Sequence, residues 1–244
     1  MIPSLRRGEI MRILEESEIE YLTPLAQKIG ISESTLRRDL KELSLGGEIE
    51  LLRGGGVRIR KDNIERGINE KILMNREEKE RIASYAAQLI RDNDIIYLDP
   101  SSLNCIMVDY IQAENIRVVT NSFEIANRLM DKGMPAILVG GDVKARTSSC
   151  IGPFAQQMMQ QMRFTKSFIG ANGMSLTMGI TSHDLRETAI KQIAIANSQT
   201  AFFLIDSSKF DNVAMYKVAE ITDCTLITGK YIEAFDRIDN IIVV

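Results

Sequence analysis

The sequence predicts an α/β protein with two domains: a small N-terminal helical domain that closes with a β-hairpin, and a larger domain with a mostly parallel sheet. Three observations lead to this expectation. Two short helical segments meet at Gly30, alternating apolar residues flank the glycines at 54–56, and apolar strands alternate with helices from Glu77 onward. We place the first domain at residues 1–61, a polar connector at 62–76 and the second domain at 77–244.

Length and composition exclude several classes of protein. The 244 residues suffice for two modest domains, and 45% hydrophobic with 26% charged residues is typical of globular chains. No apolar run has the length of a membrane span, and the N-terminal residues lack the apolar core of a signal peptide. We therefore expect a cytoplasmic protein without a membrane partner. Cys105, Cys150 and Cys224 lack the spacing of a zinc site, so we expect buried thiols, no metal and no cofactor.

Helix signals are clear in the first 45 residues. We expect helices at 5–16, at 24–29 with Thr23 as N-cap, and from Ser32, again as N-cap, to about residue 45. Gly30 ends the second helix, because glycine readily adopts the left-handed conformation found after a helix C-terminus. A short helix, a tight turn and a capped helix form the helix-turn-helix pattern.

The third helix has two chemically different faces. At about 100° per residue, Leu36, Leu40 and Leu43 fall on one stripe, which we expect to be buried. Hydroxyl and cationic side chains fall on the opposite face, where they can bond phosphates and base edges in the major groove of DNA. A basic face that is merely solvated is the alternative for this helix taken alone.

A predicted β-hairpin follows this helix. Residues 48–52 and 57–60 alternate at strand period on either side of a turn at 53–56. A helix-turn-helix followed by a hairpin is a winged helix, and the arginines beside the glycine turn favour contact with the DNA backbone. The residues predicted to contact double-stranded DNA are Ser34, Thr35, Arg37, Arg38, Lys41, Arg53 and Arg58.

In the second domain, polar residues or glycines follow each of five apolar strands. Parallel strands end at one edge of a sheet, where open α/β proteins bind ligands. Hydroxyls, glycine N–H groups, carboxylates and a lysine at this edge suit a small polyol phosphate. Polar residues that merely terminate the strands are the alternative. The predicted ligand contacts from these loops are Asp99, Ser101, Ser102, Thr120, Asn121, Ser122, Gly140, Gly141, Gly170, Asp206 and Lys209.

Several motifs in a fixed order make the chain resemble the DeoR family of bacterial transcription regulators over residues 5–244. They are TLRRDL at 35–40, EKERIASYAAQLI at 78–90, TNS at 120–122, GG at 140–141, IGPFA at 151–155, FIGANG at 168–173, ETAIK at 187–191 and DSSKF at 206–210. The resemblance implies a winged-helix DNA-binding head and a sensor domain, similar to ribose-phosphate isomerases, that binds a phosphorylated sugar or related metabolite. It adds Glu187 and Lys191 to the predicted ligand contacts.

The resemblance also implies a repressor of sugar uptake or catabolism genes, which leaves its operator DNA when the effector binds. We expect a homodimer or homotetramer, because one winged head contacts too few bases to select a genomic site. The chain departs from the family pattern at two places. Asp99-Pro100-Ser101-Ser102-Leu103 stands where the family usually has Asp-x-Gly-Thr-Thr, and Gly54 stands where the wing usually has histidine.

Two other functions are compatible with these residues. A sugar-phosphate isomerase or hydrolase fused to a DNA-binding head would need a general base, for which Asp99, Glu187 or Asp206 could serve. The single histidine, His183, is expected to cap a helix or orient a ligand rather than to catalyse. An architectural DNA-binding protein would use the second domain only to oligomerise. We expect a regulator without enzymatic activity.

Overall fold

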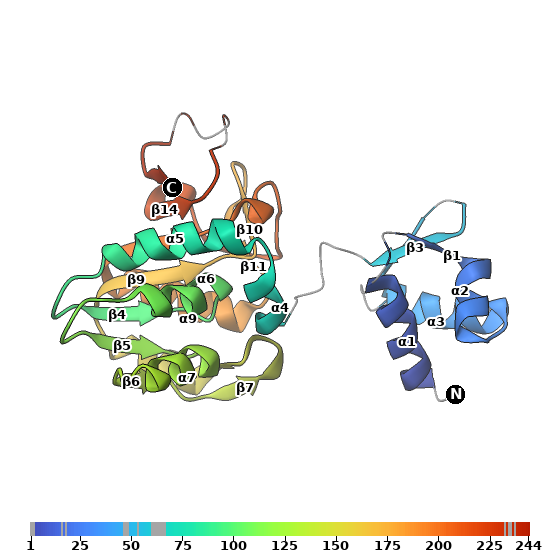
Figure 1. Cartoon of the computed structure of the whole chain (residues 1–244), viewed down its shortest axis with the longest axis horizontal. Helices are drawn as coiled ribbons and strands as arrows, with labels where there is room; N and C mark the ends of the chain where they lie inside the picture. Colours follow the sequence, from blue (N-terminus) through green and yellow to red (C-terminus); the bar gives the residue numbers. More distant parts are fainter. Residues whose placement is uncertain are drawn as a thin grey trace. The chain divides into compact units, whose positions relative to one another are not determined.

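The computed structural model describes residues 3–15, 17, 19–45, 49–52, 54–59, 67–231, 233, 236 and 238–244. The chain divides into two compact units, Met1–Ile64 and Glu65–Val244, called here the N-terminal and the C-terminal unit (Figure 1). No helix within the described ranges is long and apolar enough to cross a membrane.

The N-terminal unit packs its helices against a small antiparallel sheet. Its elements are α1 (Pro3–Glu15), β1 (Glu20–Tyr21), α2 (Leu22–Ile29), α3 (Glu33–Leu45), β2 (Ile49–Leu51) and β3 (Gly56–Ile59). The strands pair in the order β1-β3-β2. Leu36, Leu40 and Leu43 are buried with Ile10 and Leu25, which confirms the predicted apolar stripe of α3.

Local signals predict most boundaries in this unit. Gly30 follows α2 with φ 73°, and the Ser32 hydroxyl caps α3 by accepting a hydrogen bond from the Thr35 amide at 3.3 Å. The start of α2 differs from the expectation, because the helix begins at Leu22 and the Thr23 hydroxyl donates to Glu33 at 2.6 Å instead of capping. The sequence does not predict β1, since two residues are too few to show alternation.

Asp39 lies on α3 next to the buried leucine stripe. It is buried and forms an ion pair with Arg6 of α1, whose Nη2 donates to Asp39 Oδ1 at 3.0 Å. Burial of a carboxylate is costly unless a counter-charge and hydrogen bonds compensate for lost water. The pair therefore fixes the helix that carries the basic face against α1.

The C-terminal unit is built on a seven-stranded parallel sheet in the order β15-β14-β12-β9-β4-β5-β6, which confirms the predicted α/β class (Figure 1). The strands of this sheet are β4 (Ile95–Leu98), β5 (Arg117–Thr120), β6 (Ala136–Leu138), β9 (Phe164–Gly170), β12 (Ser198–Leu204), β14 (Thr225–Thr228) and β15 (Ile241–Val243). Its helices are α4 (Ile68–Leu73), α5 (Arg76–Gln88), α6 (Ser102–Met107), α7 (Phe123–Asp131), α8 (Pro153–Gln160) and α9 (Leu185–Ala196).

Two smaller sheets decorate this unit. The strands β10 (Gly173–Ser175), β11 (Gly179–Ser182) and β13 (Tyr216–Ala219) form one antiparallel sheet. The strands β7 (Asp142–Lys144) and β8 (Ser149–Ile151) form an antiparallel hairpin. Single-turn 3₁₀ helices lie at Val108–Tyr110, Ala145–Thr147, Ser207–Lys209 and Ile221–Asp223.

Helices cover both faces of the large sheet. Leu98 and Phe168 lie in the core beneath α4, α5, α6 and α7, whereas Tyr97 and Ile169 lie in the core beneath α8 and α9. Successive residues of a strand point to opposite faces, so both faces of the central strands need apolar side chains. This explains why the strands read as continuous apolar runs.

The connector predicted at 62–76 is helical in part. Residues 68–73 form α4, and Ile68 and Ile72 are buried in the same core as α5 and α6. Six residues show too little periodicity to reveal a helix from sequence, and burial against α6 stabilises what local propensity alone would not. Residues 60–66 lie outside the described residues.

Candidate functional site

The exposed face of α3 carries the predicted DNA contacts of the N-terminal unit. Ser34, Arg37, Arg38 and Lys41 are exposed, and Thr35 is half-buried, while the leucines of the opposite stripe are buried. Arg37 is 3.8 Å from Glu33, one turn earlier, an exposed pair that costs little to break. The face is a set of hydroxyl and cationic donors that can meet phosphates and guanine edges.

The hairpin places a further cation on the surface of this unit. Arg58 on β3 is exposed and bonds to Glu50 on β2, with Arg58 Nε 2.9 Å from Glu50 Oε2. Gly54 and Gly55 form the turn with φ 93° and 84°, a conformation that favours glycine. Arg53, the other predicted hairpin contact, lies outside the described residues.

In the C-terminal unit, the predicted ligand contacts gather where the strand order reverses. The chain runs from β4 outward through β5 and β6, and then returns to add β9 and β12 on the other side of β4. Asp99 follows β4, and its Oδ2 accepts a hydrogen bond from the amide of Gly170, the last residue of β9, at 3.1 Å. Ligand sites of open parallel sheets lie at this kind of switch point.

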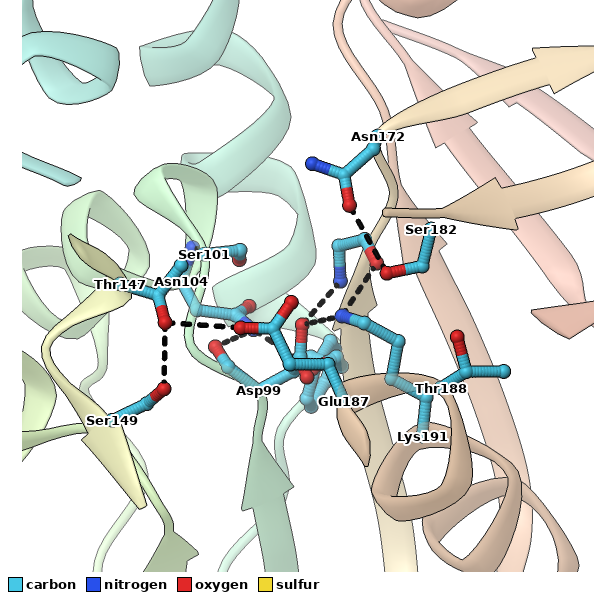
Figure 2. A network of polar contacts seen from close by, with 12 residues as sticks. Asp99, Ser101, Asn104, Thr147, Ser149, Asn172, Ser182, Glu187, Thr188 and Lys191 are labelled. Atoms are coloured by element: carbon cyan, nitrogen blue, oxygen red, sulfur yellow. Dashed lines mark hydrogen bonds and ion pairs between the residues drawn. The ribbon is translucent and has the colours of Figure 1, made fainter. Parts of the chain in front are cut away.

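A buried ion pair occupies the switch point. Lys191 on α9 pairs with Asp99, and its Nζ also donates to the Gly170 carbonyl at 3.0 Å (Figure 2). Only 5% of Lys191 and 2% of Asp99 are exposed. The Lys191 ammonium donates to Asp99 and to the Gly170 carbonyl, and the Asp99 carboxylate accepts from Lys191 and from the Gly170 amide. Both buried charges are therefore compensated. The pair therefore joins α9, β4 and β9 at the floor of the site.

Glu187 lies one turn before Lys191 and connects α9 to the β7–β8 hairpin. It accepts a hydrogen bond from Thr147 Oγ1 at 2.9 Å (Figure 2). It also accepts one from Lys144 Nζ at 3.0 Å. Thr147 in turn is 2.8 Å from Ser149 Oγ, and Lys144 is 3.4 Å from Asp184. Lys144, Thr147 and Ser149 are polar groups of the site that the sequence interpretation missed, because it did not predict the β7–β8 hairpin that carries them.

The hydroxyl and amide residues after β5 are engaged within the protein. The Thr120 hydroxyl donates to the Leu98 carbonyl at 2.7 Å, and Ser122 caps α7 by accepting from the Ile125 amide. Asn121 donates to the Cys150 carbonyl and accepts from the Tyr97 hydroxyl, each at 2.7 Å. These three predicted contacts are buried, so they shape the loop before they contact any ligand.

The loop after β4 is more open. Ser101 is half-buried and caps α6 by accepting from the Asn104 amide at 3.2 Å, whereas Ser102 is buried. Asn104 holds this loop in place by donating to the carbonyls of Asp99 and Phe168.

The two glycines of the loop after β6 differ in how closely other atoms approach them. A Cβ on Gly141 would lie 2.5 Å from the Ile151 carbonyl, whereas one on Gly140 would meet nothing within 4 Å.

Asp206 and Lys209 lie on the side of the sheet opposite the Asp99 pair. Asp206 follows β12, is buried, and contacts Asn75 and Lys79 of the α4–α5 segment. Asp99 instead contacts α9 on the other face. The sequence interpretation treats both carboxylates as one group for sugar hydroxyls. The structure separates them, because strand ends of different parity point to different faces.

The pKa values of Tyr97 and Asp206, at the carboxyl edge of the sheet, are shifted by their surroundings. Burial raises the pKa of Tyr97 well above its ordinary value, and the carboxylates of Asp99 and Glu187 raise it further, so its hydroxyl remains a donor. Burial opposes ionisation of Asp206, but hydrogen bonds from Ser208 and Asn75 and the charges of Lys79 and Lys209 lower its pKa overall. Asp206 is therefore an anion at neutral pH.

The cysteines and His183 offer no obvious chemistry. Burial raises the pKa of Cys105 to about 12 and that of Cys224 to about 11, so these thiols are protonated and inert. The His183 amide donates to Asn172 Oδ1 at 3.3 Å, at the end of β11. Among the residues that the structure describes, no three His, Cys, Asp or Glu side chains are grouped to hold a metal ion.

A winged helix with a basic recognition face, followed by an α/β unit with a polar switch point, defines a helix-turn-helix transcriptional regulator with a ligand-sensing domain. Comparison with known protein families identifies the family to which this regulator belongs. Residues 6–62 match the DeoR-like helix-turn-helix domain, and residues 74–230 match the DeoR C-terminal sensor domain. The chain belongs to the DeoR family, as its motifs indicate.

Curated relatives match over most of their length. An uncharacterised HTH-type transcriptional regulator FruR of Bacillus subtilis is 35% identical over 229 residues, covering 93% of this chain and 91% of the relative. The regulator IolR of the same species is 32% identical and covers 83% of each chain. The lactose phosphotransferase system repressor of Streptococcus mutans is 29% identical, with 90% and 91% covered.

Solved structures resemble the chain only distantly. Ribose 5-phosphate isomerase A of Methanocaldococcus jannaschii aligns with a TM-score of 0.40 and 17% identity, over 57% of this chain and 56% of the isomerase. This likeness is too weak to bear on function.

Proposed function

We propose that this DeoR-family regulator is a repressor of sugar uptake or catabolism genes that binds operator DNA through α3 and is released by a phosphorylated sugar. The observation that carries the proposal is the polar switch point of the C-terminal unit, coupled in one chain to a basic recognition helix. Relatives named as lactose phosphotransferase system repressors support repression rather than activation. The protein would act in the cytoplasm, where its operator lies.

The sensor domain offers groups that suit a phosphosugar. Ser101 lies at the switch point and Lys209 lies on the opposite face of the sheet, and each is half-buried and can donate to a phosphate. Lys144 and Glu187 can reach sugar hydroxyls by exchanging their mutual contact. The loop Asp99-Pro100-Ser101-Ser102 lacks the glycine usual in the family, so we assign more of the phosphate binding to Lys209. A ligand that inserts between these groups would change how the loops are held.

An enzymatic role is less well supported by the same geometry. Each candidate general base faces an ammonium group: Asp99 pairs with Lys191, Glu187 with Lys144, and Asp206 lies 4.0 Å from Lys79. An ion-paired carboxylate must give up a contact with its counter-ion before it can accept a proton from a substrate. Long incubation with phosphosugars followed by product analysis is expected to show no turnover.

Lys209→Ala is expected to abolish release from DNA while DNA affinity stays within about twofold. The substitution removes the proposed phosphate counter-charge and lies outside the N-terminal unit. The operator is first selected from a random duplex pool with the wild-type protein. Its dissociation constant is then measured with and without each of glucose 6-phosphate, fructose 1-phosphate, fructose 6-phosphate, tagatose 6-phosphate, ribose 5-phosphate and glycerol 3-phosphate.

Lys217→Ala is the matched control for this substitution. Lys217 is an exposed lysine on β13, paired with Glu220, and its loss removes the same charge from a residue outside the loops of the proposed site. It should respond like wild type. If Lys209→Ala still leaves DNA at the wild-type effector concentration, the phosphate does not bind at Lys209.

The sensor domain is expected to dimerise or form a tetramer on its own. Residues 65–244 form a compact unit whose core includes α4, so this fragment is the appropriate one to test. Paired heads would match two half-sites and supply the specificity that one head lacks. Sedimentation velocity at micromolar concentration checks the mass, and a monomeric fragment would argue that pairing depends on the N-terminal unit or on DNA.

A further inference from the structure

A single turn after β12 holds the start of the C-terminal unit to the edge of the sheet. The part of the turn that makes contacts lies at residues 206–208, which are the N-cap and first two residues of the 3₁₀ helix Ser207–Lys209, and the segment facing it comprises the end of α4 and the first turn of α5. The two regions are far apart in sequence, since Asn75 and Asp206 are separated by 131 positions. In the chain, α4 and α5 follow directly on the residues that lead from the DNA-binding head (Figure 1).

Three side chains of this segment make the contacts. Asn75, in the left-handed region at φ 50°, donates from Nδ2 to Asp206 Oδ1 at 3.0 Å. Glu78 accepts from both the amide and the hydroxyl of Ser207, each at 2.8 Å. Lys79 donates to the Lys71 carbonyl at the end of α4 and lies 4.0 Å from Asp206 Oδ2. The turn therefore holds both helices at their junction.

The position of Lys79 makes this junction sensitive to added charge. Lys79 is 3% exposed, and burial lowers its pKa. The carboxylates of Asp206 and Glu78 counteract that effect, while the ammonium groups of Lys209 and Lys71 add to it. The Lys79 ammonium is thus acted on by two carboxylates and two other ammonium groups. An anion that binds Lys209 would offset the repulsion on Lys79 and favour a closer contact with Asp206.

We propose that Asn75, Glu78 and Lys79 are positioning residues that transmit anion binding at Lys209 to the α4–α5 junction, and through it to DNA affinity. This inference rests on the proposed function, and it assigns the route of regulation within the sensor domain. It predicts that the contacts with the 206–208 turn carry the coupling, whereas the effector and the DNA each bind without them. Effector binding and DNA binding are linked by one factor that can be measured from either side.

The first test separates binding from coupling in the full-length protein. Glu78→Gln and Asn75→Ala weaken the contacts with the turn without touching Lys209 or α3. For the phosphosugar of the panel above that releases wild type, the dissociation constants for phosphosugar and for operator are each expected to change less than about threefold. The coupling factor, typically about 5–150-fold in allosteric proteins, should fall to within twofold of one.

Glu80→Gln is the control for these variants. Glu80 lies on the same helix and pairs with Arg76 at i,i+4, away from the 206–208 turn. It should retain the wild-type coupling factor. Glu78→Gln and Asn75→Ala proteins that bind both partners and retain wild-type coupling would overturn the inference while leaving the proposed function standing. A wild-type protein that no phosphosugar releases would instead count against the proposed function.

A second measurement needs no effector. Hydrogen exchange of the full chain is followed with and without the selected operator duplex. Because coupling is reciprocal, DNA should change the exchange of amides at 68–79 and at 204–209 in wild type, and only at 68–79 in Glu78→Gln. The proposed route is overturned if DNA does not change the amide exchange of residues 204–209 in wild type. It is also overturned if DNA changes that exchange equally in wild type and in Glu78→Gln.

Discussion

Replacing Lys191 with methionine is expected to destabilise the sensor domain by about 3–5 kcal/mol, the usual cost of leaving one member of a buried ion pair without its partner. Asp99 would keep the Gly170 amide as a donor but lose its counter-charge in a site where 2% of the residue is exposed. Methionine preserves most of the volume, so lost packing contributes little. The calorimetric transition of this domain should fall by roughly 6–20 °C.

A second variant distinguishes charge from shape at this position. Lys191→Met combined with Asp99→Asn removes both charges, and the Asn oxygen can still accept from Gly170. Much of the lost stability should return, because paired removal of buried charges is often close to neutral. A single Lys191→Met substitution that costs less than about 1 kcal/mol would show that water reaches the pair and that it is not the floor of a dry site.

Replacing Arg37 and Arg38 by alanine is expected to remove most sequence-specific DNA binding. An arginine that reads a guanine contributes about 1–3 kcal/mol, so each substitution should weaken specific binding on the order of 5- to 150-fold. Both side chains are exposed on α3, and their loss leaves the buried leucine stripe unchanged. Competition between the selected duplex and a scrambled one measures the specific part of the affinity.

Lys41→Ala is the companion variant on the same face. If Lys41 contacts phosphate, its loss should weaken all DNA sequences alike and reduce the slope of log affinity against log salt by about one. Circular dichroism verifies that each variant keeps its helical content. Unchanged operator affinity in Arg37→Ala/Arg38→Ala would falsify the docking of α3 in the major groove and favour a merely solvated basic face.

Short-range patterns in the sequence are sufficient for much of the N-terminal unit. The turn at Gly30, the cap at Ser32 and the stripe through Leu36, Leu40 and Leu43 involve residues a few positions apart, whose geometry follows from backbone conformation and helical period. The motifs of the second half likewise indicated the family, which the comparisons confirm. The helical period predicts the outward position of the α3 cations correctly, because that position depends only on the spacing of residues within the helix.

Long-range contacts set the limits of the same reasoning. Arg6 and Asp39 are 33 positions apart, Lys144 and Glu187 are 43 apart, and Lys191 and Asp99 are 92 apart. Nothing in a local pattern states which oppositely charged residues will meet, because the pairing depends on how strands are ordered and which helix covers each face. For this reason the pairing of Asp39 with Arg6 and the part played by Lys144 were not predicted.

The sequence by itself determined the fold class, the family and the outward position of the α3 cations, and it predicted polar residues at the ends of parallel strands. Only the tertiary structure decided how that edge is divided. Asp99 turns toward Lys191 on α9, and Asp206 turns toward Asn75 and Lys79 beneath α5. The physical reason is the alternation of side chains along a strand, which points the residue after β4 and the second residue after β12 to opposite faces once the register is set.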